Sequence, residues 1–121
     1  LSRAVWAAFE AWSVWSSIKL NIQDRPYRSH SVTSVSMQAP SGTELRKCTE
    51  HRAGVTLGLG IGMAEPDDPA RHGFFRVAHM GHVNAHMTLG MLGVLDAGFK
   101  ALKAPHGDGA LEAASRILSE A

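Results

Sequence analysis

Three histidines in the second half of the sequence have the residue type and the spacing to bind a metal ion. His79, His82 and His86 are three and four residues apart. A zinc site needs three or four such ligands converging at about 2.1 Å, and this spacing would suit one face of a continuous helix. Gly81 and Asn84, however, predict a turn within the segment, and no carboxylate or thiol with motif spacing accompanies the histidines. We therefore favour hydrogen-bonded or solvent-facing histidines and keep a metal site as the alternative.

A glycine run that could cradle a phosphate follows the β-prone residues 55–57. Gly58, Gly60 and Gly62 alternate with apolar residues. A phosphate-binding loop needs such a turn at the N-terminus of a helix, where backbone amides point at the anion. Here residues 66–69, two prolines and two aspartates, follow in place of a helical pattern. A flexible hinge between strand and loop is the favoured interpretation.

Two further side chains could take part in chemistry. Arg76 lies in a strand-like run, and its planar guanidinium can donate two parallel hydrogen bonds to a carboxylate, a geometry that lysine cannot match. Taken alone, it would be interpreted as a surface arginine at the end of a strand. Cys48 is the single cysteine, and with no partner motif around it we expect a small buried residue. No nucleophile is paired with a nearby base, so catalysis by these residues alone is poorly supported.

The composition is that of an ordinary folded domain. A length of 121 residues suits one domain, and 45% hydrophobic and 19% charged residues are near the globular average. The formal net charge of +1 is spread without a basic stripe, so nucleic acid is not an expected partner. The most apolar stretch, residues 88–102, is interrupted by Asp96 and Lys100 and is shorter than the roughly 20 residues of a membrane span. We therefore expect no contact with a membrane.

Apolar periodicity and capping signals predict the elements that must position these residues. Helices are predicted over residues 1–16, 41–53, 84–104 and from 108 onward, and strands over 32–37, 55–57 and 74–79. Helix ends are predicted at residues suited to cap them, namely Ser41 with Glu44 in capping-box form, Gly54, Asn84 and Asp108. This order predicts an α+β fold, with a short sheet covered by helices, and does not specify the order of the strands.

Residues 75–84, Phe-Arg-Val-Ala-His-Met-Gly-His-Val-Asn, resemble the Arg-Ile-Gly-His-Met-Gly element near the C-terminus of class V aminotransferases, notably the serine–glyoxylate and alanine–glyoxylate aminotransferases. Residues 28–33 resemble the family's Arg-Ser-Asn-Ser-Val-Thr entry to a strand, 58–60 its Gly-Leu-Gly loop, and 87–93 its last long helix. The resemblance covers nearly the whole chain. Val77 stands in place of the family's Ile and Ala78 in place of its Gly, a change that bears on substrate fit.

The resemblance implies that residues 1–121 are the C-terminal small domain of a fold-type I enzyme that uses pyridoxal 5'-phosphate. It implies transfer of an amino group from a small amino acid, of the serine or alanine type, to a small 2-oxo acid such as glyoxylate, with Arg76 binding the substrate α-carboxylate. In this family a preceding large domain holds the cofactor through a lysine Schiff base, and the four lysines here, Lys19, Lys47, Lys100 and Lys103, match no such motif. The chain alone would then be inactive, and the whole enzyme would be a homodimer.

Two other classes of function stay open at this point. A free-standing binding module would explain the apolar face of the first helix, and a metal-binding protein would use the three histidines. The start at Leu1, without a methionine or an export signal, favours a fragment of a larger enzyme. The single cysteine is compatible with a reducing compartment, so we expect a cytoplasmic location. An upstream region of about 250 residues would support the enzyme, and an initiator methionine just before Leu1 would support the module.

Overall fold

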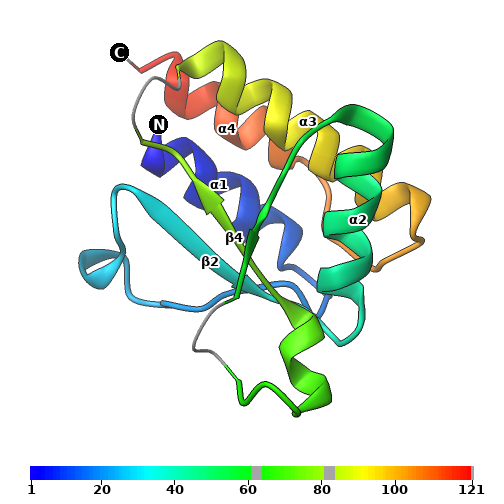
Figure 1. Cartoon of the computed structure of the whole chain (residues 1–121). Helices are drawn as coiled ribbons and strands as arrows, with labels where there is room; N and C mark the ends of the chain where they lie inside the picture. The colour runs from blue at the N-terminus through cyan, green and yellow to red at the C-terminus, as the bar shows by residue number, and fades with distance from the viewer. Residues whose placement is uncertain (61–63, 81–83, 121) are drawn as a thin grey trace.

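A four-stranded antiparallel sheet with its helices on one side forms the fold (Figure 1). The computed structural model describes residues 1–60, 64–80 and 84–120. The strands β1 (Lys19–Leu20), β2 (Val32–Ser36), β3 (Gly58–Leu59) and β4 (Phe74–Ala78) lie in the order β1-β2-β4-β3. The helices are α1 (Ser2–Trp12), α2 (Ser41–Ala53), α3 (Ala85–Ala101) and α4 (Ala110–Leu118). The predicted α+β class, a short sheet covered by helices, is confirmed.

Helix α1 forms the centre of the core, and it ends earlier than its apolar spacing predicts. Phe9 and Trp12 are fully buried, and their rings pack edge to face with centroids 5.0 Å apart. The prediction that the helix continues to residue 16 is wrong, because the Ser16 hydroxyl bonds the Trp12 carbonyl at 2.8 Å and Trp15 adopts a left-handed φ of 56°. Trp15, which lies within the predicted helix 1–16, is 95% exposed.

The sheet has one buried face and one face without helix cover among the described residues. Alternate residues of β2 and β4 face the helices, and Val35 and Phe75 on this side are fully buried. The opposite face holds Ser34 and Arg76, which are directly paired in the register of β2 and β4. In Figure 1 the strands cross in front of α1, so the view is onto this open face. Any site on the sheet must therefore lie here or at its edges.

Several predicted boundaries are confirmed and others are corrected. Strands β2 and β4 lie where they were predicted, whereas the predicted strand 55–57 forms three residues later as β3, and the two-residue β1 was not predicted. Two 3-10 turns, η1 (Arg25–Tyr27) and η2 (Pro69–Gly73), lie in segments that were predicted as loops. Helix α3 ends at Ala101, three residues before the predicted limit, and Lys103 beyond it has a left-handed φ of 55°.

Two of the four predicted helix caps form. Asn84 Oδ1 accepts a hydrogen bond from the Met87 amide at 2.9 Å, and Gly54 adopts a left-handed φ of 68° after α2. The other two are wrong: Pro40 is the N-cap residue of α2, so that Ser41 is already helical, and Gly109, with φ 82°, takes the N-cap position of α4. Neither of these helices has a side-chain cap.

None of the helices in the described ranges combines the length and the apolarity needed to cross a membrane.

Candidate functional site

Arg76 lies in the middle of β4 on the open face of the sheet. It pairs with Ser34 of β2 on one side and with Gly58 of β3 on the other. Its side chain is half-buried. A β-carbon built on Gly58 would lie 3.3 Å from the Arg76 β-carbon and 3.5 Å from its Nε, so glycine at this position leaves the space that the side chain uses.

The Arg76 guanidinium is hydrogen-bonded to the backbone through Nε, whereas its two terminal nitrogens have no partner among the described residues. Nε donates a hydrogen bond to the Leu59 carbonyl at 2.5 Å. Within residues 1–60, 64–80 and 84–120, no side chain or carbonyl accepts from Nη1 or Nη2, and no carboxylate forms an ion pair with this arginine. The terminal fork is thus fixed in position and can donate two parallel hydrogen bonds to a carboxylate.

A groove of about 280 Å³ opens beside Arg76. Its walls are mostly apolar and come from the start of β2, from β4 and the residue that follows it closely, from the segment that leads into β3, and from α3; they include Val32, Val77, Met80 and Met91. An apolar wall beside a guanidinium reduces the screening of its charge by water, which strengthens its attraction to an anion. The groove therefore suits a small molecule with an apolar part and a carboxylate.

The three histidines of the metal hypothesis do not meet in the part of the chain that can be described. His79 is buried, its Nε2 lies 2.8 Å from the Thr33 hydroxyl, and its Nδ1 lies 3.0 Å from the His30 carbonyl oxygen. His86 is exposed in the first turn of α3, and His82 lies outside the described residues. Among the residues described, no group of three or more potential ligands is suited to a metal ion. Both ring nitrogens of His79 are already engaged, so its role is structural.

Burial controls the protonation of His79. Loss of hydration disfavours the charged ring and lowers the pKa of His79, and the hydrogen bond to the His30 carbonyl opposes this effect only in part. The carbonyl oxygen can only accept, so Nδ1 carries the proton and Nε2 accepts from the Thr33 hydroxyl. The ring is therefore a neutral link between the two central strands.

Two glycines of the predicted hinge, Gly58 and Gly60, are closely packed. Gly58 leaves room for Arg76, and a β-carbon on Gly60 would overlap the Phe74 side chain. Gly62 lies outside the described residues. Among the described residues, the next helical segment is η2, a 3-10 turn of five residues. The described part of the run therefore lacks the geometry of a phosphate loop, in which a helix follows the glycines directly.

The remaining candidate residues are placed as follows. Cys48 is half-buried on α2. The four lysines, Lys19, Lys47, Lys100 and Lys103, are all exposed. A Schiff-base lysine needs an enclosed site in which burial or a neighbouring charge lowers its pKa. In the described structure the four exposed lysines lack such an enclosure.

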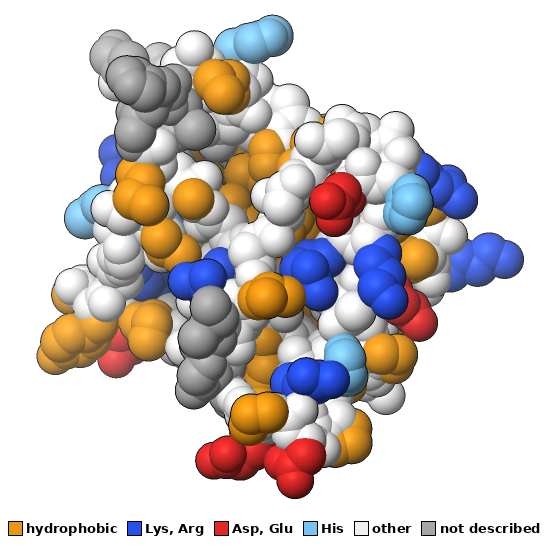
Figure 2. Space-filling model, in the orientation of Figure 1, with side chains coloured by type: hydrophobic (Ala, Val, Ile, Leu, Met, Phe, Trp, Pro, Cys, Tyr) orange, Lys and Arg blue, Asp and Glu red, His pale blue; other side chains and the backbone are white. Residues whose placement is uncertain are grey.

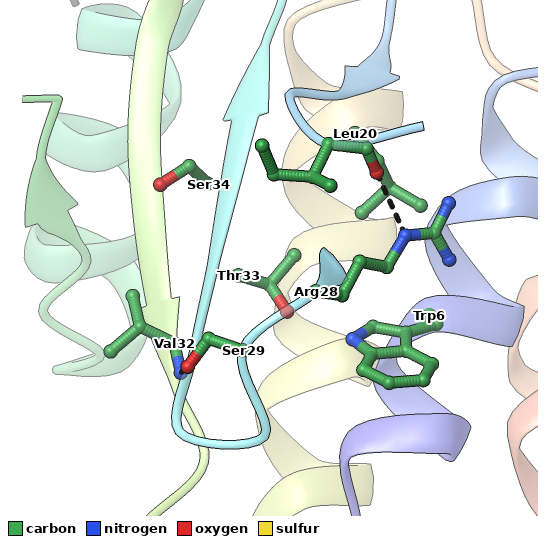
Figure 3. Close-up of a pocket in the computed structure, with 8 residues that line it drawn as sticks. Trp6, Leu20, Arg28, Ser29, Val32, Thr33 and Ser34 are labelled. Carbon is green, nitrogen blue, oxygen red and sulfur yellow. Dashed lines mark hydrogen bonds between the residues drawn. The ribbon is translucent and has the colours of Figure 1, made fainter. Parts of the chain in front are cut away.

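A cluster around Arg28 was not recognised from residue types, although residues 28–33 belong to the resemblance noted above. Its guanidinium donates to the carbonyls of Ile22 at 2.8 Å and Gln23 at 2.9 Å and to the Glu10 carboxylate at 2.7 Å. Figure 3 shows Arg28 between Leu20 and the Trp6 ring, whose centroid lies 5.5 Å from the guanidinium carbon. The cavity beside it measures about 20 Å³, room for a single water molecule, so the cluster is structural.

Comparison with known proteins shows the fold. No family model and no curated protein sequence matches the chain. Among solved structures it is similar to ureidoglycine–glyoxylate aminotransferase from Bacillus subtilis, with a TM-score of 0.75 and 22% sequence identity. The similarity covers 96% of this chain and 28% of that chain. The chain thus has the fold of a part of an aminotransferase, and it spans little more than a quarter of that protein's length.

Proposed function

We propose that this chain is the small domain of a pyridoxal-phosphate-dependent aminotransferase and that Arg76 binds the α-carboxylate of the substrate. The observation that carries the proposal is that Arg76 lines an apolar groove and that its Nη1 and Nη2 have no partner among the described residues, in a fold similar to part of an aminotransferase. By its resemblance to class V enzymes, the whole protein would transfer an amino group from a small amino acid to a small 2-oxo acid such as glyoxylate.

The geometry supports binding of the carboxylate by the two terminal nitrogens of Arg76. The Leu59 carbonyl accepts from Nε of Arg76, and no partner among the described residues accepts from Nη1 or Nη2. Two parallel hydrogen bonds from these atoms would fix both the position and the plane of a carboxylate. The apolar groove is wide enough for the short side chain of a serine or alanine type of amino acid. Arg76 would therefore orient the substrate, which is a positioning and binding role.

The cofactor would be bound outside this chain. Pyridoxal phosphate would supply the electron sink for the amino transfer when bound. Because the four lysines are exposed and lie outside the groove, the lysine that carries the cofactor would belong to another part of the enzyme. We accordingly expect the isolated chain to be inactive. By the resemblance to class V enzymes we expect the whole enzyme to be a homodimer, and the single cysteine fits a cytoplasmic location.

The test uses the full-length gene product. Arg76→Lys replaces a fixed fork with a single point charge, so kcat/KM for amino acid donors should fall by about ten- to a hundredfold. The corresponding amines without a carboxylate should be used equally by the variant and the wild type, and the cofactor absorbance should be unchanged. Arg116→Lys, on the exposed face of α4, is the matched control.

Two results would contradict the proposal. An equal loss with both classes of substrate would mean that Arg76 supports the structure and does not bind the carboxylate. A full-length protein with no bound pyridoxal phosphate would contradict the assignment to an aminotransferase.

A further inference from the structure

We propose that a second pocket, lined by Leu59 and Gly60 at the end of β3 where the Arg76 groove is lined by residues 55–58, binds a small anion of the phosphate type with two or more negative charges. We call this cavity the basic pocket. Its polar lining consists of Thr43, Arg46 and Lys47 of α2 with Arg71 and His72 of η2. The pocket measures about 500 Å³, within the range of small-molecule sites. This proposal does not depend on the proposed function.

The helical register of α2 brings three donors to one side. Thr43, Arg46 and Lys47 are three and four residues apart, so they share the helix face that lines the pocket. Arg71 and His72 approach from η2, which is far from α2 in sequence. In the view of Figure 2, Lys, Arg and His side chains lie over α2 and over the segment that leads into β4.

The positive charges of the basic pocket are not neutralised within the described residues. Arg46, Lys47 and Arg71 take part in none of the ion pairs found there, and no carboxylate lines the pocket. Residues 61–63, Ile-Gly-Met, add no acid. Other cations of the chain do form ion pairs with carboxylates, namely Arg3, Arg25, Arg28, Lys100 and Arg116. The pocket is thus a local excess of positive charge on a chain whose net charge is only +1.

Backbone packing fixes the two halves of the pocket relative to each other. Gly42 at the start of α2 is buried against Gly73 at the end of η2, and a β-carbon on Gly42 would lie only 2.7 Å from the Gly73 carbonyl carbon. The Thr43 hydroxyl and His72 Nδ1, 2.8 Å apart, add a hydrogen bond between the same elements. Asp68, the acid nearest to Arg71 in sequence, is turned back to accept from the Ala70 amide at 2.9 Å.

These features favour a phosphate over a single carboxylate. Guanidinium and ammonium donors from two directions can surround a tetrahedral dianion with charge-assisted hydrogen bonds, whereas one carboxylate would use only one arginine fork. The pocket is open to solvent, so binding should weaken as salt screens the charges.

Isothermal titration of the 121-residue chain with inorganic pyrophosphate at low ionic strength tests the proposal. We expect saturable binding of one anion per chain, weaker at high salt. Arg46→Gln/Lys47→Gln/Arg71→Gln should weaken it at least tenfold. Lys19→Gln/Lys103→Gln/Arg116→Gln removes the same net charge from exposed positions elsewhere and should change it less than twofold. Arg71→Glu alone, on the surface turn η2, should also weaken binding and serves if the first triple variant fails to fold.

Two further measurements distinguish a specific phosphate site from a general attraction of anions to a basic surface. Succinate should bind more weakly than inorganic phosphate, and succinate binding of equal strength would overturn the phosphate assignment. Arg76→Lys should leave pyrophosphate binding unchanged, which keeps this test distinct from that of the proposed function. Absence of saturable binding, or an equal loss in the two triple variants, would show that no specific anion site exists.

Discussion

The Thr33 hydroxyl and the His79 ring meet at the buried end of the two central strands, with Oγ1 and Nε2 2.8 Å apart. The same ring donates from Nδ1 to the His30 carbonyl, and the His79 amide bonds the Ser31 carbonyl at 2.8 Å. His79 follows β4 directly and Thr33 belongs to β2. The ring therefore fastens the segment that enters β2 to the end of the strand that carries Arg76.

The first prediction is that stability falls in mild acid because of His79. Its pKa is lowered in the folded state by burial, so the unfolded chain binds a proton first as the pH falls. Stability is full above the ordinary histidine pKa of about 6.5 and is lost progressively below it, down to the lowered folded value. Urea unfolding between pH 5 and 8 should show this slope in the wild type. A smaller slope is expected for His79→Gln, and an identical slope in both proteins would rule out the buried ring as its cause.

Local signals predicted the part of the structure that depends on neighbouring residues. The alternating residues of β2 and β4 and the cap at Asn84 were found because apolar spacing and side-chain capping act within a few residues. The short β1 was not found, because its two residues form a strand only by pairing with β2. The end of α1 was missed because the Ser16 hydroxyl competes with continued helix.

Less of the candidate site than of the fold could be predicted from the sequence. Arg76 was identified by the resemblance, whereas the bond that holds its Nε follows from the strand register and the Leu59 carbonyl. The basic pocket joins α2 to η2, and its residues are separated along the chain by the whole of β3. No periodicity reports such a contact, because it depends on how Gly42 packs against Gly73.

The second prediction concerns two glycines with opposite surroundings. A β-carbon on Gly107 would overlap the Ala11 carbonyl oxygen and lie 3.1 Å from the Val14 β-carbon, so Gly107→Ala should destabilise the fold by about 1 to 3 kcal/mol. Gly90, within α3, has nothing within 4 Å of the same position, so Gly90→Ala should stabilise by about 0.4 to 1 kcal/mol. The midpoints of urea unfolding measure both changes in stability. Equal effects of the two changes would contradict the packing of Gly107 against α1.

The third prediction compares the two arginines that bind Glu10. The Arg28 side chain is 6% exposed and the Arg25 side chain 49% exposed, although both contact the same carboxylate. Arg28→Lys cannot keep the bonds to Ile22, Gln23 and Glu10 together, so it should cost about 1.5 to 3 kcal/mol of unfolding free energy. Arg25→Lys should cost less than about 1 kcal/mol, as exposed ion pairs do. Chemical denaturation at neutral pH measures both losses, and comparable losses would mean that the additional hydrogen bonds of Arg28 contribute little.

The last prediction tests the positioning of Arg76 through its neighbour in the sheet. In Gly58→Ala the new methyl group would lie 3.3 Å from the Arg76 β-carbon, tighter than an ordinary contact, and in ordinary contact with Nε at 3.5 Å, so the arginine must move by a few tenths of an ångström. The hydrogen bond from Nε to the Leu59 carbonyl should weaken, which would be seen as faster solvent exchange of the Nε proton by NMR of the chain itself. In the full-length enzyme, as proposed above, kcat/KM for carboxylate substrates should fall on the order of tenfold, because a displaced fork aligns poorly with a carboxylate.

The double variant shows whether this loss arises from Arg76. If Gly58→Ala acts by displacing the guanidinium, it should add little to Arg76→Lys, since residues that act on one interaction are not additive. Gly54→Ala would be a poor control because that residue has a left-handed φ of 68°, whereas Gly93→Ala, with nothing within 4 Å, changes a glycine without contact. Additive losses in the double variant, or an unchanged Nε exchange rate in Gly58→Ala, would mean that Gly58 does not set the position of the arginine.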